Sequence, residues 1–305
     1  MRKMPNSIYP LRLNYKQVLS KGMILMKTNY IYTTIDEIPL SFDFYKNKVN
    51  ESKPTIIYFH GGGLIFGSKD DLPKAYIDLF LNEGYNLIAL DYPLAPECKI
   101  DTIFSAIQSF FNWFETNYQK ALHLKTDDKI LFGRSAGAYL ALQWASKIKV
   151  SGVISFYGYH TLFHNDFLLP SESFKKYPIL PFSDVTHLLS NHFLISSSVE
   201  ERYPIYLSLR QSGNWIKEIL GKDNLIDDYS LTVNQLKKLP PIFITASRSD
   251  EDVPFFLSNM LSKQVTNSTF IKHTGVVHDF DRQPELAESK LTYDALLTWL
   301  NELTE

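Results

Sequence analysis

A serine, an aspartate and a histidine stand at positions where side chains of these types could do nucleophilic chemistry. Ser135 is the central residue of GRSAG, residues 133–137. Asp250 and His278 come later, each just beyond a segment with the composition of a buried strand. A serine hydroxyl becomes a nucleophile when an imidazole takes its proton and a carboxylate orients that imidazole. We therefore predict that Ser135 is the nucleophile, His278 the general base and Asp250 the orienting acid.

The surroundings of Ser135 strengthen this prediction. The preceding residues KILF (129–132) are typical of a strand, and the helical pattern AYLALQWASKI follows. A serine on so sharp a strand-to-helix turn needs Gly133 and Gly137 beside it, because a side chain at either position would clash. The alternative is a turn of small residues that serves only close helix packing.

Two of these assignments have competitors nearby. Asp252 is the other carboxylate in this segment, and we favour Asp250 because it lies nearer the strand end, where geometry is best fixed. His273 reads as the end of a strand, which favours a structural role over a catalytic one. The remaining histidines lack the spacing of metal ligands, so no metal site is expected at His123, His160, His164, His187 or His192.

The run HGGG, residues 60–63, follows another buried strand. Attack by serine on a carbonyl places negative charge on oxygen, and preorganised N–H groups must meet that charge. Glycine amides can approach closely because no Cβ intervenes. We predict that the amides of Gly62, Gly63 and Ala136 form an oxyanion hole, that Gly61 completes the loop, and that His60 shapes it by hydrogen bonding.

The rest of the sequence, which must position these residues, has the alternating strand and helix patterns that are typical of an α/β fold. Residues 28–46 alternate polar and apolar about a turn, which predicts an antiparallel hairpin. Continuous apolar runs, typical of strands buried on both faces of a parallel sheet, then alternate with helical segments, so we expect a mostly parallel, doubly wound sheet. The strands are expected at 55–60, 85–92, 129–133, 150–158, 241–247 and 268–273, and helices at 71–84, 103–118, 135–148 and 284–303.

The alternation stops between residues 159 and 239, a stretch rich in aromatic residues and polar turns. It is too long for a structureless loop, so we expect a mostly helical insertion that caps one end of the sheet. We expect residues 28–305 to form one domain with this insertion. Residues 1–27 read as a leader that could join the cap, and Met23 and Met26 are candidate translation starts.

Composition excludes several classes of function. A formal net charge of -2 over 305 residues gives no reason to expect nucleic acid or an anionic membrane as partner. The single cysteine, Cys98, excludes an intrachain disulfide and a thiolate cluster. The sequence contains neither an apolar run long enough for a membrane helix nor a convincing signal peptide, so we expect a cytoplasmic protein.

The motifs HGGG, DYPLAPE (91–97) and GRSAG occur in an order and spacing that resembles the hormone-sensitive-lipase-like branch of the α/β-hydrolase fold. The resemblance covers roughly residues 50–300. It implies a serine carboxylesterase that needs no cofactor and hydrolyses short-chain or small apolar esters under a helical cap, which in this family often includes N-terminal residues.

Two residues depart from the pattern of this family. Pro93 stands where the family usually has arginine, and Arg134 where it usually has aspartate or glutamate. Both changes alter charge in neighbouring motifs. We hypothesise that Arg134 pairs with Asp91 or Glu97 and braces the turn at Ser135; the alternative is a solvated arginine.

Two other functions remain open from the sequence. A small amidase or peptidase of the same fold would use the same machinery on an amide. A non-catalytic binding protein could keep the fold, although this chain retains every residue type that catalysis requires. The partner expected in each case is a small molecule, and a homodimer also remains open.

Overall fold

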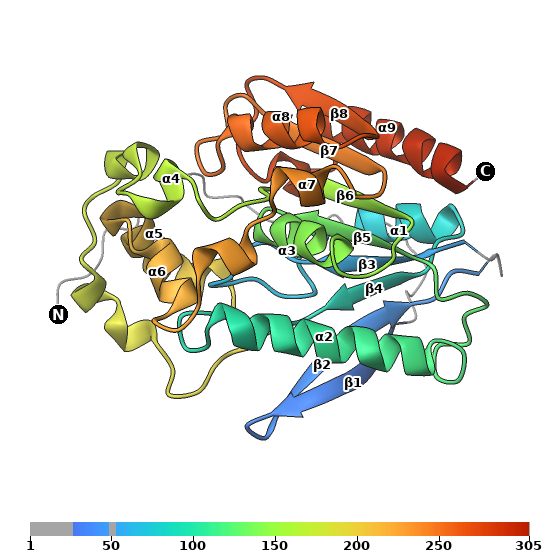
Figure 1. The fold of residues 1–305 in the computed structure, drawn as a ribbon, viewed down its shortest axis with the longest axis horizontal. Coiled ribbons are helices and arrows are strands. Elements are labelled where there is room, and N and C mark those ends of the chain that lie inside the picture. The colour runs from blue at the N-terminus through green and yellow to red at the C-terminus, as the bar shows by residue number, and fades with distance from the viewer. Residues whose placement is uncertain (1–26, 49–52, 305) are drawn as a thin grey trace.

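A sheet of eight strands runs through the protein in the computed structural model, which describes residues 27–48 and 53–304 (Figure 1). The predicted leader, with Met23 and Met26, lies outside the described residues except for Lys27, the first residue of the first strand.

The strands lie in the order β1-β2-β4-β3-β5-β6-β7-β8. The β1–β2 and β2–β4 pairs are antiparallel, and the others are parallel. This confirms the predicted mostly parallel sheet with an N-terminal antiparallel hairpin. The strands are β1 (Lys27–Ile35), β2 (Ile38–Tyr45), β3 (Thr55–Phe59), β4 (Leu87–Leu90), β5 (Lys129–Arg134), β6 (Gly152–Phe156), β7 (Ile242–Ser247) and β8 (Ser268–His273).

Helices cover both faces of the sheet because the strands are apolar on both faces. In β3, Ile57 and Phe59 point into one core and Ile56 and Tyr58 into the other, as side chains alternate along a strand. The first core also takes residues of α2 (Ile100–Asn117), α3 (Ala136–Ala145) and α8 (Phe255–Gln264). The second takes residues of α1 (Lys74–Asn82) and α9 (Ala287–Thr304).

The sequence did not predict α8, whose first residue follows Pro254 closely after the expected carboxylate loop. In α9 the buried face is Tyr293, Leu296, Trp299 and Leu300, with the small polar residues Ser289 and Thr292. Leu291 is 54% exposed. Two aromatic residues and two leucines therefore fill the space between this helix and the sheet.

Residues 157–241, here called the cap segment, connect β6 to β7. The longest helix of the cap segment is α5 (Val199–Ser212), which begins with a capping box between Ser198 and Glu201 and ends at Gly213 in the left-handed conformation. The others are α4 (Asn165–Leu168), α6 (Trp215–Leu220) and α7 (Val233–Leu236). Figure 1 shows α4, α5 and α6 gathered beyond one end of the sheet, on the left of the view.

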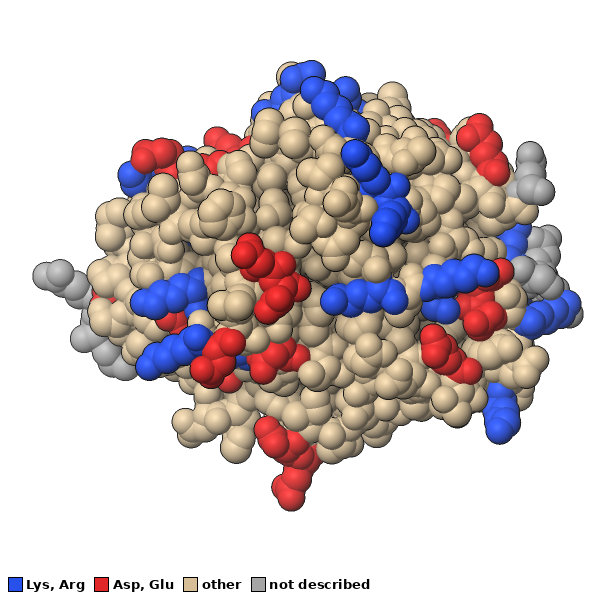
Figure 2. All heavy atoms as spheres, in the orientation of Figure 1, with Lys and Arg blue, Asp and Glu red and all other residues tan. Residues whose placement is uncertain are grey.

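Within the described ranges, no helix has the length and apolar composition needed to cross a bilayer. On the face shown in Figure 2, basic and acidic side chains are interspersed rather than segregated by sign.

Candidate active site

Ser135 occupies the turn between β5, which ends at Arg134, and α3, which begins at Ala136. Its backbone has φ 54° and ψ -120°, an unfavourable conformation for a residue with a side chain. The turn is possible because its flanks have no side chains: a Cβ on Gly133 would lie 2.1 Å from the carbonyl carbon of Gly137, and a Cβ on Gly137 would lie 2.1 Å from the carbonyl oxygen of Phe59.

The structure brings Ser135, His278 and Asp250 into one hydrogen-bonded chain. Ser135 Oγ lies 2.9 Å from His278 Nε2. His278 Nδ1 lies 2.7 Å from Asp250 Oδ2. With the proton on Nδ1, the imidazole donates to the carboxylate and leaves Nε2 free to accept the serine proton. The chain runs from nucleophile to base to carboxylate in the predicted order.

The Asp250 side chain is held by backbone amides of the residues that follow it in the loop. Its Oδ1 accepts hydrogen bonds from the amides of Asp252 (2.9 Å) and Val253 (3.0 Å), so Oδ2 is the oxygen left for His278. Ser249 Oγ in turn accepts from the amide of Gly275 at 2.9 Å, which ties this loop to the one that carries His278.

The two competing residues lie elsewhere. Asp252 Oδ2 approaches His278 on the other ring nitrogen, 4.0 Å from Nε2. His273 is at the end of β8, where its Nε2 lies 2.8 Å from Thr292 Oγ1 of α9.

Three carboxylates surround His278. Burial disfavours the charged imidazolium, but the charge and hydrogen bond of Asp250, followed by the charges of Asp252 and Asp279, outweigh it and raise the pKa of His278 above its ordinary 6.5. Burial alone would raise the pKa of Asp279, yet the nearby Arg282 guanidinium and His278 hold it well below its usual range. The site therefore favours positive charge on the base once it has taken a proton.

The glycine loop leaves amides free near Ser135. In the described part of the chain, no protein acceptor takes a hydrogen bond from the amides of Gly62, Gly63 or Ala136. Gly63 has φ +61°, and a Cβ there would lie 2.5 Å from the ring of Tyr206. Gly61 packs against the turn at Ser135, where a Cβ would lie 3.1 Å from the carbonyl oxygen of Arg134.

His60 is buried beneath this loop. Its ring stacks on Tyr92 with centroids 4.1 Å apart, and its Nδ1 lies 2.8 Å from the carbonyl oxygen of Gly61. Burial lowers the pKa of His60. A neutral imidazole in this position can donate to the loop, and no hydrogen bond joins it to Ser135 or His278.

The cap segment contacts the glycine loop through two side chains, those of Trp215 and Arg202. Trp215 Nε1 of α6 donates to the carbonyl oxygen of Gly63 at 3.0 Å. Arg202 of α5 donates to the carbonyl oxygens of Ile65 (2.7 Å) and Ala95 (2.8 Å) and forms a bidentate pair with Glu97. The sequence does not indicate these contacts, because the partners, three backbone carbonyls and the Glu97 carboxylate, lie more than a hundred residues away.

The predicted partners of Arg134 are wrong. Asp91 is taken by Lys69, with Nζ 2.5 Å from Oδ2, and Glu97 by Arg202. Arg134 instead pairs with Asp281: its Nη2 lies 3.3 Å from Asp281 Oδ1. Alternation along β5 places Arg134 on the face of the second core, where it also reaches the hydroxyl groups of Tyr58 and Tyr157.

Tyr157 joins this buried pair to the base. Its hydroxyl accepts from Arg134 Nε at 2.8 Å and donates to Asp281 Oδ1 at 2.5 Å, while its ring meets the His278 ring edge-on with centroids 4.6 Å apart. Its φ of 40° places it in the left-handed region. The charged triplet Asp279, Asp281 and Arg282, directly after His278, was the only sequence signal for this network.

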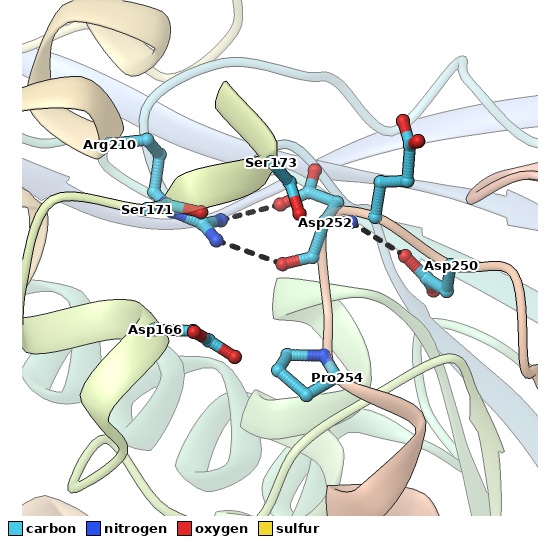
Figure 3. A pocket seen from close by; sticks show the side chains of 8 residues that line it. Asp166, Ser171, Ser173, Arg210, Asp250, Asp252 and Pro254 are labelled. Atoms are coloured by element: carbon cyan, nitrogen blue, oxygen red, sulfur yellow. Dashed lines mark hydrogen bonds and ion pairs between the residues drawn. The ribbon is translucent and has the colours of Figure 1, made fainter. Parts of the chain in front are cut away.

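A polar pocket of about 160 Å³ lies beside Asp252, between the cap segment and the loop after β7 (Figure 3). Arg210 of α5 reaches it and holds Asp252 through two of the dashed contacts in the figure. The pocket is lined by Asp166, Ser171, Ser173, Arg210, Asp250, Glu251, Asp252 and Pro254.

The α/β fold and the Ser135–His278–Asp250 arrangement indicate an α/β hydrolase, and comparison with known proteins gives the same class. The α/β-hydrolase fold family matches residues 56–282, so the chain belongs to this family. The resemblance to its hormone-sensitive-lipase-like branch is confirmed.

Named relatives place the chain among esterase-like members. "Probable carboxylesterase M8" of Phoma sp. is 24% identical over 88% of this chain and 94% of its own length. A solved structure of a protein of unknown function from Staphylococcus aureus subsp. aureus Mu50 is 33% identical, with a TM-score of 0.82 over 91% of this chain and 100% of its own. An α/β-hydrolase superfamily protein from Enterococcus faecalis is 29% identical, with a TM-score of 0.76 over 91% and 99%. The chain is an esterase-like α/β hydrolase.

Proposed function

We propose that this protein is a serine carboxylesterase that hydrolyses short-chain or small apolar esters through an acyl-enzyme. The observation that carries the proposal is the continuous chain from Ser135 Oγ through His278 to Asp250, with separations of 2.9 Å and 2.7 Å. These distances lie within the range that proton transfer requires.

In the first half of the reaction, Ser135 Oγ bonds to the ester carbonyl carbon while His278 Nε2 takes the hydroxyl proton. The tetrahedral intermediate then loses its alcohol: the bond from carbon to the alcohol oxygen breaks, and His278 gives the proton to that oxygen. Asp250 stays ionised and keeps the imidazole in the required tautomer. The acyl group remains on Ser135.

In the second half, water attacks the acyl carbon and His278 takes one of its protons. Collapse of this intermediate releases a carboxylic acid and returns the proton to Ser135 Oγ. One ester and one water thus give one acid and one alcohol, and no cofactor enters the balance.

The negative oxygen formed in both halves would be met by the amides of Gly62, Gly63 and Ala136. Their freedom from protein acceptors among the described residues supports this role. Ala136 is also the first residue of α3, where the helix dipole favours an anion. Loss of one oxyanion donor typically costs roughly 2.7 to 4 kcal/mol of transition-state stabilisation.

The proposal is tested by exposing the purified protein and its Ser135→Ala variant to a fluorophosphonate probe. Hydrolysis of p-nitrophenyl esters from acetate to decanoate is followed in parallel. We expect labelling and hydrolysis in the wild type, loss of both in the variant, and the highest rates at short acyl length. A wild-type protein that neither labels nor hydrolyses any of the esters contradicts the proposal.

A further inference from the structure

Asp252 presents a carboxylate oxygen to the place where the alcohol of an ester would leave. Its Oδ2 lies 4.0 Å from His278 Nε2, the atom that must hand a proton to the alcohol oxygen. Within the described ranges, no side chain or amide donates a hydrogen bond to this oxygen, and the Asp252 side chain is 22% exposed. A substrate can therefore reach it.

The other half of the Asp252 side chain is fixed. Oδ1 accepts from Tyr206 at 2.6 Å and from Arg210 Nη1 at 2.5 Å, and the Asp252 carbonyl oxygen accepts from Arg210 Nη2 at 2.9 Å. Arg210 is itself enclosed by the aromatic rings of Phe167, Phe174, Tyr206 and Trp215, 4.5 to 5.5 Å away. These contacts leave Oδ2 as an oriented acceptor rather than a mobile surface charge.

The pocket beside Asp252 is likewise rich in hydrogen-bond acceptors. Four of its lining residues are carboxylates, against the single cation Arg210, and two more are serines. In Figure 3, Asp166 and Pro254 lie across the space from the Arg210–Asp252 contacts, and Ser171 is drawn beside Arg210. Such a lining opposes anionic groups and favours groups that donate hydrogen bonds.

We propose that Asp252 selects esters whose alcohol carries a hydroxyl or a protonated amine on the carbon next to the ester-bearing carbon. Such a group lies close enough to the leaving oxygen to donate to Asp252 Oδ2 while that oxygen faces His278 Nε2. The inference rests on the proposed function and narrows it: the acyl chain is short, and the alcohol is a diol, a polyol or an amino alcohol.

The test compares four acetates that differ only in the alcohol: 2-hydroxyethyl, 2-methoxyethyl, propyl and protonated 2-(dimethylamino)ethyl. The methoxy ester keeps the oxygen but removes the donor. We expect kcat/KM for the 2-hydroxyethyl ester to exceed that for the 2-methoxyethyl ester by about tenfold, as a hydrogen bond to a charged group provides. The amine ester shows whether a cationic donor is preferred to a neutral one.

The Asp252→Asn variant asks whether this residue is responsible. Tyr206 and Arg210 both donate to the Oδ1 position, so they fix the amide oxygen there and leave the NH₂ group where Oδ2 was. That group donates instead of accepting, and the preference for the hydroxyl should vanish or reverse. Because a ratio of two substrates is measured on one variant, a general change in rate cancels.

Asp279→Asn is the matched control. Asp279 Oδ1 lies 3.8 Å from His278 Nε2, but this residue is not part of the pocket lining, and asparagine tolerates its φ of 58°. It should keep the wild-type ratio.

Three results overturn the inference: a wild-type ratio near one, a ratio unchanged in Asp252→Asn, or a ratio lost in Asp279→Asn. If p-nitrophenyl acetate is hydrolysed and the fluorophosphonate labels Ser135 while no preference appears, only this subsite is wrong. If neither labelling nor hydrolysis occurs, both proposals fall.

Discussion

Arg134 Nη2 lies 3.3 Å from Asp281 Oδ1, and the two side chains are 1% and 0% exposed. The residue beside the nucleophile is thus paired with the loop that follows the base. The Tyr157 hydroxyl bridges the same two groups, and Tyr293 donates to the second Asp281 oxygen at 3.1 Å. Both Asp281 oxygens thus accept a hydrogen bond, whereas Arg134 Nη2 is held by its charge alone, with no hydrogen-bond partner among the described residues.

Replacing one partner of this ion pair should destabilise the fold, because the other partner stays buried with an unpaired charge. We expect Arg134→Met to lower the free energy of unfolding by about 3 to 5 kcal/mol, because Asp281 stays buried without its cation. Urea unfolding measures this change in the free energy of unfolding. The double variant Arg134→Met/Asp281→Asn should regain part of the loss, since the uncompensated charge is gone. A change of less than about 0.5 kcal/mol in the single variant contradicts the pairing.

Tyr157 combines two roles that two variants separate. Tyr157→Phe keeps the ring against His278 but removes the hydroxyl, so we expect a stability loss of about 1 to 3 kcal/mol with little change in kcat. Tyr157→Ala also removes the ring, and kcat should fall by about tenfold or more because the base loses a wall of its site. Steady-state kinetics and thermal unfolding measure both; equal kcat in the two variants rules out a positioning role for the ring.

The bond from Trp215 to Gly63 should be visible in the rate of chemistry. Trp215→Phe leaves the Gly63 carbonyl oxygen without its donor, and the shifted loop should lower kcat on p-nitrophenyl acetate by about tenfold. Trp144→Phe is the control, since Trp144 Nε1 is buried but has no hydrogen-bond partner among the described residues. The idea fails if the two variants have the same kcat.

The carboxylates around His278 should set the pH dependence. The imidazole must be neutral to take the serine proton, and its raised pKa means that kcat/KM keeps rising above pH 6.5. Asp252→Asn and Asp279→Asn each remove a charge that favours the imidazolium, so each should lower this pKa and move the acid limb to lower pH. A pH profile of kcat/KM checks the shift, and limbs that coincide with the wild type contradict it.

The sequence predicted the sheet and the chain from Ser135 to Asp250 because both depend on local patterns. A glycine-flanked serine between a strand and a helix, and carboxylate and imidazole after later strands, follow from the order of elements. The same holds for the hairpin at 28–46, which forms β1 and β2, although the last four residues of β2 are all buried.

The partners of Arg134 could not be found in this way. Asp91 and Glu97 lie in a neighbouring motif, but Lys69 and Arg202 already pair with them, and Asp281 reaches Arg134 from a turn 147 positions later. The roles of Arg210 and Tyr206 were hidden for a similar reason, since a segment rich in aromatic residues does not tell which ring will enclose a cation. Long-range contacts of side chains depend on packing that no short pattern encodes.

The Arg202–Glu97 pair has a consequence for anyone who would exchange parts between related enzymes. Arg202 belongs to the cap segment, whereas Glu97 and the carbonyl groups of Ile65 and Ala95 belong to loops of the sheet. A chimera that imports residues 157–241 without a matching arginine would leave the buried Glu97 carboxylate and two carbonyl groups without a partner at the junction. An exchange between enzymes should therefore include the cap segment together with residues 60–67 and 91–97, because these three segments contact one another through Arg202.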